Sequence, residues 1–592
     1  MRRVMLSAGG ARQGRRRVVA LLIALLGAAA GIALVLPGGD GATGTPSGPQ
    51  HPAEFASARV TRPARPHAAR AAQMPQAVVT ISPRASTTPV PPSYFGLSTE
   101  YWALPLFERN MPVFERVLSL LHVPGSEPLV LRIGGDSADH SFWMPRETTR
   151  RMPAWAFAVT PEFLAQLRSL VERDRVKLIV DLNLVTDTPL TAAAWARAAE
   201  TSLPRGSIIG FEVGNEPDLY TRSYWLATIA RSPLEARPLP LELTPDSYVD
   251  DFDAYARVLG EGAPGVPLIG PAVAHPRVSL KWIKTLIADQ RPGLGAVSAH
   301  LYPYSACVKH PSNSSYPTVA RLLSWQAVGA LAKDVAGAVA VAHGADLKLR
   351  LTELNSVTCG GKAGVSNTFA TALWAPDALF TLMRAGVDSA NLHVRAYAIN
   401  APFSLTPRGL FARPLLYGLV MFARTLGADA RLVRLHMSHP RSLNLSAWGV
   451  RVRGDLLHVL LIDKSNRTVR FDLRLPATDP ATLQRLLAPS ASSTTGETLD
   501  GQRLGPDGTW VGTRLTETIT RGAHGGYALT VPRRSAALVG VRIAPRVNAT
   551  AVPAPGRAAG RHRITRVRHR AKARSDPTIL AEQPGRRGVR RA

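Results

Sequence analysis

The chain has 592 residues, of which 45% are hydrophobic and 19% are charged. It is therefore long enough for more than one folded core and has an ordinary globular composition. Its formal net charge of +29 would suit a nucleic-acid-binding protein, but the charge is concentrated at the two ends. Residues 1–76 contain ten arginines and two acidic residues, and residues 550–592 contain twelve basic and two acidic residues. This distribution indicates basic tails and argues against a nucleic-acid partner.

The first 36 residues have the pattern of a targeting element. Arg15, Arg16 and Arg17 precede a run of 19 apolar or glycine residues, 18–36. A basic flank followed by an apolar run is typical of export, and this run is just long enough to span a bilayer. Residues 1–36 are predicted to be a signal peptide or a signal anchor that contacts the membrane. In both cases the rest of the chain is expected to be extracellular or membrane-anchored facing outside.

Two segments lack the periodicity of folded elements. Residues 37–76 are rich in Gly, Pro, Ala, Arg and Thr, and we predict a disordered linker. Residues 546–592 are rich in Arg and Pro, and we predict a disordered basic tail. Such a tail could contact an anionic cell-surface polymer, or it could be solvated without a specific partner.

Between these segments, eight short apolar runs alternate with helical stretches. The runs are residues 94–99, 129–133, 177–182, 208–213, 267–273, 296–301, 347–352 and 390–394. Eight strands alternating with helices predict a (β/α)8 TIM barrel over residues 77–427. A doubly wound sheet has a similar pattern, but it would normally bring a glycine-rich phosphate turn after the first strand, and the sequence has none there.

The pattern changes after residue 427. Short alternating runs separated by Gly, Asn, Asp and Pro turns predict a C-terminal antiparallel β-sandwich domain over residues 428–545. Residues 77–81 precede the first barrel strand and could add a strand to this sandwich.

Two glutamates follow predicted barrel strands. The sequence GFEVGNEP at 210–217 places Glu216 after the fourth strand, and LRLTELN at 349–355 places Glu353 at the end of the seventh. Active sites of this fold lie at the carboxyl ends of the strands. A facing pair of carboxylates suits a retaining glycosidase, with Glu216 as general acid/base and Glu353 as nucleophile. Either glutamate alone could instead form a surface salt bridge.

Several segments together resemble glycoside hydrolase family 79, the β-glucuronidase and heparanase-like group within a large clan of (β/α)8 retaining glycosidases. They are LRIGGDS at 131–137, VGNEP at 213–217, SAHLYP at 298–303, TELNSVTCGG at 352–361, and residues 366–393. The likeness spans about residues 77–545. It implies cleavage of a β-linked glucuronic acid from a glycan or glycoside with retention of configuration.

The resemblance also implies roles for further residues, each with a structural alternative. Asn215 is expected to bind the sugar 2-hydroxyl, Tyr302 the nucleophile, and Gly360 and Gly361 the uronate carboxylate through their amides. The remaining expected substrate-binding residues are Asp136, Glu100, Tyr397 and His300. Any of them could instead serve packing or turn geometry.

The only two cysteines, Cys307 and Cys359, follow the sixth and seventh predicted strands. Because these loops are neighbours at the barrel mouth, we expect a disulfide that braces the glycine loop, with two free thiols as the alternative. No metal site or cofactor is expected, since no ligand spacing stands out and the chemistry needs only two carboxylates.

The expected partner is a carbohydrate substrate that contains a uronic acid. Two alternatives stay open: a glycosidase of the same fold that acts on a neutral sugar, and a cell-surface carbohydrate-binding protein with little turnover. Intact Glu216 and Glu353 argue against the binding protein.

Overall fold

The computed structural model describes residues 73–146, 155–174, 176–222, 243–289, 291–477, 480–523 and 525–543. The predicted targeting segment 1–36, nearly all of the predicted linker 37–76 and the predicted tail 546–592 lie outside these residues. Within the described ranges, no helix combines the length and the apolar character needed to cross a bilayer.

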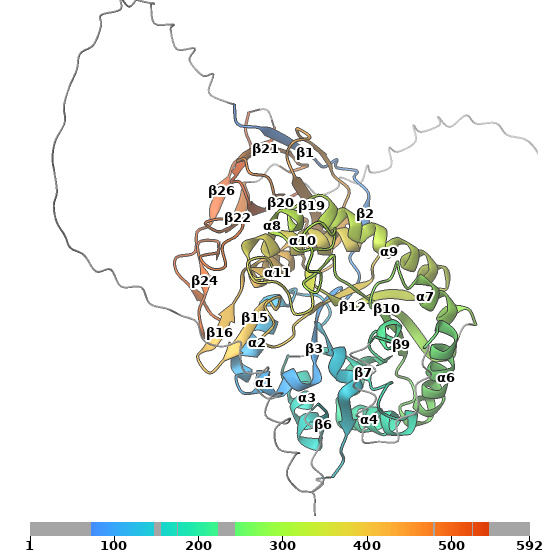
Figure 1. The fold of residues 1–592 in the computed structure, drawn as a ribbon. Coiled ribbons are helices and arrows are strands. Elements are labelled where there is room, and N and C mark those ends of the chain that lie inside the picture. The colour runs from blue at the N-terminus through green and yellow to red at the C-terminus, as the bar shows by residue number, and fades with distance from the viewer. Residues whose placement is uncertain are drawn as a thin grey trace, which may run out of the picture. The chain divides into compact units, whose positions relative to one another are not determined.

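Eight parallel strands close into a barrel, as the sequence predicts (Figure 1). Around the barrel they follow the order β10, β12, β14, β3, β4, β7, β8, β9. Their bounds are β3 Phe95–Glu100, β4 Val130–Gly134, β7 Lys177–Leu182, β8 Ile208–Val213, β9 Leu268–Val273, β10 Leu294–Leu301, β12 Lys348–Leu354 and β14 Ser389–His393. Every strand has apolar residues because side chains face either the barrel interior or the surrounding helices.

Helices follow the barrel strands. The main ones are α2 Met111–Leu121, α3 Pro161–Asp174, α4 Pro189–Ser202, α6 Pro245–Gly262, α7 Leu280–Ile287, α9 Gln326–Gly344, α10 Phe369–Arg384 and α11 Pro414–Thr425. Most are amphipathic, but the side chains of α10 are buried on all its faces. This helix contacts α9, α11 and a strand of the second domain, so it has no solvent side and needs no polar face.

The barrel interior is layered. Val130, Ile179, Ile269 and Ala296 form an apolar cluster inside it. Polar side chains replace this cluster toward the carboxyl ends of the strands, where Arg132 and Glu212 are fully buried. The β10–β12 register shifts between Ala299 and His300, so that His300 pairs with Glu353. Irregularities of this kind re-aim a side chain, and this one sets the position of His300 at the barrel mouth.

The second domain is a sandwich of two sheets. The four-stranded sheet has the order β18 (His436–Ser438), β1 (Gln76–Thr80), β21 (Val469–Arg474), β27 (Tyr527–Val531). The eight-stranded sheet contains β2 (Thr87–Pro89), β17 (Arg431–Val433), β19 (Leu445–Val452), β20 (Leu456–Asp463), β28 (Ser535–Arg542), β22 (Ala481–Leu487), β23 (Thr498–Leu499) and β26 (Glu517–Ile519).

Two strands of this sandwich come from the N-terminal side of the barrel. β1 lies beside β21 in Figure 1, and the two strands pair in parallel. β2 pairs antiparallel with β17. The sandwich is therefore not purely antiparallel, and residues 76–89 belong to it and not to the barrel. β1 precedes the barrel in the sequence and runs in the same direction as β21, its neighbour in the sheet.

A buried polar cluster joins the barrel to the sandwich. Asp377 of α10 accepts hydrogen bonds from Ser446 Oγ and Trp448 Nε1 of β19, both at 2.8 Å. Lys464, which follows β20, forms an ion pair with Asp377 at 2.5 Å, and both side chains are almost completely buried. Phe380 of α10 stacks on Trp448 at 5.4 Å between ring centroids. This junction fixes one face of the larger sheet against α10.

Candidate active site

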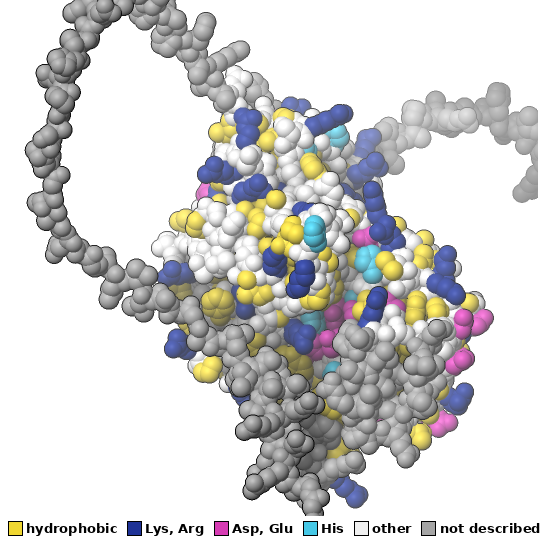
Figure 2. All heavy atoms as spheres, in the orientation of Figure 1, with side chains coloured by type: hydrophobic (Ala, Val, Ile, Leu, Met, Phe, Trp, Pro, Cys, Tyr) yellow, Lys and Arg dark blue, Asp and Glu magenta, His cyan; other side chains and the backbone are white. Residues whose placement is uncertain are grey.

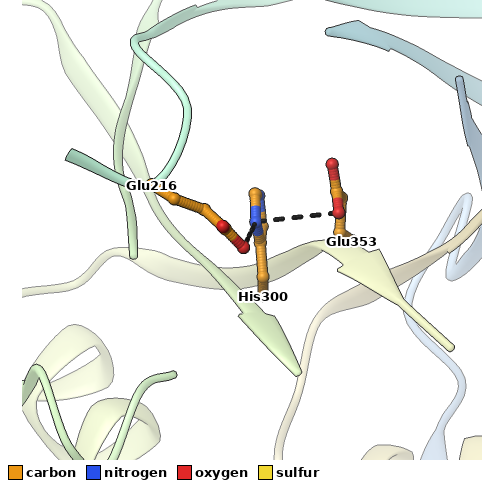
Figure 3. Close-up of side chains that lie close together, drawn as sticks. All are labelled: Glu216, His300 and Glu353. Carbon is orange, nitrogen blue, oxygen red and sulfur yellow. Dashed lines mark hydrogen bonds and ion pairs between the residues drawn. The ribbon is translucent and has the colours of Figure 1, made fainter. Parts of the chain in front are cut away.

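Glu216 and Glu353 meet at the barrel mouth. Glu353 is the penultimate residue of β12, and Glu216 follows β8 by three residues. Figure 3 shows the two carboxylates on either side of His300. One carboxylate oxygen of each glutamate and one ring nitrogen of His300 all lie within 4.8 Å of one another. The sequence-based pairing of these two glutamates therefore corresponds to direct neighbours in space.

A left-handed backbone turn aims Glu216 into the barrel mouth. The residue has φ of 52°, a conformation that is uncommon for a residue with a side chain. Its N–H donates to the carbonyl of Ala272 at 3.0 Å, and its own carbonyl accepts from the N–H of Leu219 at 2.8 Å. These two hydrogen bonds hold the turn from both sides. Unusual backbone conformations of this kind cluster at functional sites.

Arg132 of β4 is the centre of the charge network. It is fully buried, and its guanidinium makes ion pairs of 2.8 Å with Asp181, Glu212 and Glu353. It also donates to Asn215 Oδ1 at 2.9 Å and to Ser98 Oγ at 3.4 Å. These five partners match the five N–H donors of a guanidinium. Arg132 therefore ties the Glu353 carboxylate to Asn215 and to the barrel interior.

The glycines after Arg132 leave room for this network. A Cβ on Gly134 would lie 2.6 Å from Asp181 and 2.7 Å from the Arg132 guanidinium carbon. A Cβ on Gly135 would lie 2.8 Å from the Glu100 carboxylate, and its φ is 73°. The Gly-Gly pair in LRIGGDS is thus required by close approach of charged side chains.

The environment of Glu353 favours its ionised form. One carboxylate oxygen pairs with Arg132, and the other accepts a hydrogen bond from Tyr302 Oη at 2.9 Å. Burial alone would raise its pKa, but the charges of His393, His300 and Arg132 and the Tyr302 hydrogen bond lower it to about 2. Arg350, the neighbouring arginine on β12, donates instead to Ser389 at 3.2 Å.

The environment of Glu216 has the opposite effect. Burial raises the pKa of Glu216, and the nearby charges of Glu353 and Asp218 add to the rise. His300 opposes it through a hydrogen bond between Nδ1 and Glu216 Oε1 at 2.9 Å. Although burial disfavours the charged imidazole, the Glu353 and Glu216 carboxylates raise the pKa of His300. Two neighbouring carboxyl groups thus have pKa values shifted in opposite directions.

Asn215 is held from both its backbone and its side chain. Its N–H lies 3.3 Å from Asp139 Oδ2 and 3.2 Å from Tyr220 Oη, while its Oδ1 accepts from Arg132. Asp139 also accepts from the N–H groups of Leu184 and Val185 at 2.7 and 3.2 Å. Because Arg132 engages the side-chain oxygen, the NH₂ group is the part of the Asn215 amide that remains for a ligand of the pocket that Asn215 lines.

A pocket of about 350 Å³ lies over the two glutamates, and we call it the active-site pocket. Its lining residues are Glu100, Asp136, Asn215, Glu216, Leu219, Tyr302, Glu353, Thr358, Cys359, Gly360, His393, Arg395 and Asn400. On the face shown in Figure 2, acidic, basic and histidine side chains lie side by side near the middle. The pocket collects most of the residues that the sequence predicts for the site.

Glu100 and Asp136 form the acidic wall of the active-site pocket. Glu100 accepts from the N–H of Ser137 at 2.9 Å. Burial alone would raise its pKa, but His393 and Arg395 lower it. Asp136 is nearly half exposed, and partial burial together with the neighbouring carboxylates raises its pKa to about 7.

Three predicted residues lie differently from expectation. Gly360 lines the pocket, but the N–H of Gly361 donates to the carbonyl of Thr358 at 3.2 Å in a tight turn and is not free for a ligand. Tyr397 is 63% exposed and does not line the pocket. His300 lies below the surface of the pocket and contacts the two glutamates. A turn hydrogen bond decides the position of Gly361, loop direction that of Tyr397 and a register shift of β10 that of His300, and none of these is visible in the pattern of apolar runs.

Cys307 and Cys359 form a disulfide, the first of the two alternatives left by the sequence. It lies beside a short parallel pair of β11 (Tyr304–Ser305) and β13 (Val357–Thr358). The bond connects the loop after β10 to the loop that carries Thr358 and Gly360. It therefore braces one wall of the active-site pocket.

Several site residues were not predicted from the sequence, namely Arg132, Asp139, Asp181, Glu212, His393 and Arg395. Three of them, Arg132, Asp181 and Glu212, are charged residues within apolar strands, which is a usable signal because an unpaired charge is rarely buried. Arg132, between Leu131 and Ile133, is the plainest example. Arg395 carries no such signal, because it lies in a loop.

The groups Glu216, His300 and Glu353 are also of the kinds that ligate metals. Among the described residues, these three form the one group of possible ligands whose atoms converge to within 4.8 Å. The sequence around them contains no metal-binding motif. Their hydrogen bonds to one another and to Arg132 and Tyr302 account for their arrangement.

Comparisons with known proteins agree with this architecture. Residues 443–538 match the model of the glycosyl hydrolase family 79 C-terminal beta domain. A β-glucuronidase of Aspergillus niger is 23% identical over 521 residues, which is 77% of this chain and 92% of the relative.

Solved structures share the fold at low identity. A 4-O-α-L-rhamnosyl-β-D-glucuronidase from Fusarium oxysporum, in complex with Rha-GlcA, superposes with a TM-score of 0.63. It is 18% identical, over 78% of this chain and 99% of that one. A family 51 arabinofuranosidase from Xanthomonas axonopodis has a TM-score of 0.58 at 14% identity, over 79% of this chain and all of that one. Residues 443–538 thus match a domain of glycoside hydrolase family 79, and the barrel with its second domain shares the fold of solved glycoside hydrolases.

Proposed function

We propose that the protein is a retaining β-glucuronidase, in which Glu353 is the nucleophile and Glu216 is the general acid/base. The observation that carries this proposal is the close pairing of two carboxylates, whose nearest oxygens lie within 4.8 Å. Retaining enzymes need carboxyl groups about 5–5.5 Å apart, whereas inverting enzymes need about 6.5–9.5 Å to admit a water.

The opposed pKa shifts suit the first step. With its pKa lowered to about 2, Glu353 is ionised and attacks the anomeric carbon, forming a glycosyl ester. Glu216, whose pKa is raised, holds a proton and delivers it to the leaving oxygen as that bond breaks. Tyr302 and Arg132 hold the attacking carboxylate in place throughout.

The same electrostatics suit the second step. Once Glu353 is an ester it has lost its negative charge, and one cause of the raised pKa of Glu216 disappears. The pKa of Glu216 then falls, so the residue takes a proton from water. That water attacks the anomeric carbon, Glu353 leaves, and the product has the starting configuration.

The choice of a uronic acid rests on the relatives and on the pocket. The Aspergillus niger relative is named a β-glucuronidase, and the Fusarium oxysporum structure a rhamnosyl-β-D-glucuronidase. The pocket offers the Gly360 loop and a cation, Arg395, beside acceptors for ring hydroxyls, Glu100 and Asp136. Glu100 and Asp136 lie 3.7 and 4.0 Å from the Arg395 guanidinium, so a neutral sugar would bring no carboxylate to accept its hydrogen bonds.

We also propose that the protein acts outside the cytoplasm. The Cys307–Cys359 disulfide lies at an exposed position, and lasting disulfides are typical of oxidising compartments. The basic flank and apolar run within residues 1–36 suit export. Fractionation of producing cells tests this, since recovery of the active protein only from the cytoplasm would contradict it.

The function is tested with the full chain on an aryl β-D-glucuronide and the matching aryl β-D-glucoside. We expect hydrolysis of the glucuronide, loss of nearly all activity in Glu353→Gln, and unchanged activity in Glu108→Gln, an exposed glutamate on another element. NMR of the first product should show the β-anomer, and an α-anomer would contradict the retaining mechanism. Hydrolysis of the glucoside alone would keep the mechanism and reject the uronic acid.

A further inference from the structure

Arg395 is an arginine of the active-site pocket whose donors are not used. It follows β14 by two residues, and its side chain is 45% exposed. Its nearest carboxylates are Glu100, at 3.7 Å from Nε, and Asp136, at 4.0 Å from one terminal nitrogen. Both distances are too long for hydrogen bonds. Among the described residues, no acceptor forms a hydrogen bond with this guanidinium.

The other cations at the site are already engaged. Arg132 is fully buried and has five protein partners, so it offers nothing to a ligand. His300 is buried and hydrogen-bonded to Glu216. His393 lies between Ser98 and the carboxylates of Glu353 and Glu100. Among the pocket-lining residues that the structure describes, Arg395 is therefore the arginine whose N–H groups are available to a ligand.

The pocket needs such a cation if its ligand is an anion. Four carboxyl groups line it, those of Glu100, Asp136, Glu216 and Glu353. Unit charges a few ångströms apart interact by several kcal/mol at the effective dielectric of a partly buried site, so a uronate would be repelled without compensation. The Gly361 amide cannot compensate, because its N–H is bound to Thr358.

The Gly360 loop and the Arg395 loop are connected. The N–H of Asn400 donates to the carbonyl of Gly360 at 3.2 Å, and the N–H of Ala398 donates to the carbonyl of Arg395 at 3.1 Å. The Asn400 side chain donates to the carbonyl of Val357 at 2.8 Å. These bonds place Arg395 and Gly360 on adjoining loops that follow neighbouring strands, β14 and β12.

We propose that Arg395 is the specificity-determining residue that binds the carboxylate of the uronic acid substrate. A guanidinium offers two parallel N–H groups that match the two oxygens of a carboxylate, and this geometry rejects a hydroxymethyl group. Glu100 and Asp136 hold the guanidinium in the pocket by charge, and although one Glu100 oxygen accepts from the N–H of Ser137, the two carboxylates keep further acceptor positions for ring hydroxyls. This inference rests on the proposed β-glucuronidase function.

The test compares Arg395→Gln, Arg395→Lys and the control Arg408→Gln in the full chain. Arg408 is an exposed arginine on the turn between β15 (Phe403–Thr406) and β16 (Gly409–Ala412), outside the pocket. Each variant is measured on an aryl β-D-glucuronide and the matching β-D-glucoside. We expect Arg395→Gln to lose roughly 100-fold in kcat/KM on the glucuronide and less than about threefold on the glucoside. Arg395→Lys should fall between, and Arg408→Gln should match the unaltered protein.

A binding measurement makes the test independent of turnover. Calorimetry of D-glucuronic acid and of D-glucose with Glu353→Gln, with and without Arg395→Gln, should show loss of glucuronic acid binding only. Equal losses on both sugars would mean that Arg395 merely positions Glu100 and Asp136, and would overturn the proposal. Unchanged glucuronide activity and binding in Arg395→Gln would overturn it as well. An unaltered protein that hydrolyses only the glucoside would reject the proposed function itself.

Discussion

At the scale of single residues, Arg132 organises the charged groups at the carboxyl end of the barrel. Its guanidinium binds Asp181, Glu212 and Glu353 at 2.8 Å and also reaches Asn215 and Ser98. Removing a charge from a buried network leaves its partners uncompensated. The position of Glu353, the proposed nucleophile, and the stability of the barrel interior therefore depend on the same side chain.

We predict that Arg132→Lys keeps the positive charge but loses most of the hydrogen bonds that the guanidinium makes. A lysine has three donors on one nitrogen and cannot reach five partners at separate positions. We expect kcat/KM to fall by roughly 100-fold, with a lower midpoint of thermal unfolding. Arg350→Lys on β12, whose partner is Ser389, is the matched control and should keep near-full activity. Near-normal kinetics in Arg132→Lys would show that Glu353 is held by its other contacts.

The pH dependence of activity follows from the opposed pKa shifts. The proposed mechanism requires ionised Glu353 and protonated Glu216, so kcat/KM should be bell-shaped, with the acid limb set by Glu353 and the alkaline limb by Glu216. Tyr302→Phe removes a hydrogen bond that lowers the pKa of Glu353, so the acid limb should move to higher pH. kcat should also fall by about 10- to 100-fold.

His300→Asn should shift both limbs. His300 lowers the pKa of Glu216 and also that of Glu353, so its loss raises both values and moves the whole bell to higher pH. The profile of kcat/KM against pH distinguishes the two variants. A profile that moves only on the alkaline side in His300→Asn would contradict the contact with Glu353.

At the scale of elements, the strands were predictable and the loops were not. Each of the eight apolar runs became a barrel strand because burial on both faces demands a continuous apolar pattern. Glu216 and Glu353 were predictable because strand ends of this fold converge. Gly361 and Tyr397 were not, because a turn hydrogen bond and an outward loop decide where their amide and ring lie. The sequence predicted that residues 77–81 could add a strand to the sandwich, and β1 does so; its pairing with β21, almost 400 residues away, is not encoded by a local pattern.

The loop disulfide is predicted to support both stability and activity. It closes a loop of 52 residues, and the chain-entropy relation gives about 4 kcal/mol for a loop of this length. Reduction should lower the midpoint of thermal unfolding and raise KM, because Cys359 and Gly360 line the pocket.

The control for this effect is the double variant Cys307→Ser with Cys359→Ser, which should already have the lower midpoint and should not respond to reductant. An unaltered protein whose midpoint and KM are both insensitive to complete reduction, verified by thiol titration, would contradict the predicted brace.

At the scale of the whole described molecule, barrel and sandwich meet through a charged cluster that water does not reach. We predict that Lys464→Met lowers the free energy of unfolding by about 3–5 kcal/mol, because Asp377 keeps its charge and loses its ion pair. Urea unfolding measures this change. Lys333→Met, on the exposed side of α9, should leave the stability near its original value. If Lys464→Met lowers the free energy of unfolding by less than about 1 kcal/mol, the hydrogen bonds from Ser446 and Trp448 are enough to stabilise the buried Asp377 carboxylate.

The position of β1 has a consequence for how the protein is made. β1 lies between β18 and β21, yet its residues leave the ribosome hundreds of residues before either partner. At about 5–20 residues per second, the strand waits roughly 20–80 s for residues 469–474. During that time the barrel can close, while an unpaired strand with apolar residues at its three central positions stays open to pairing with other chains. The first strand of the described chain therefore finds its place only after β21 has been made, and slower translation of the sandwich would lengthen the interval in which nascent chains can aggregate.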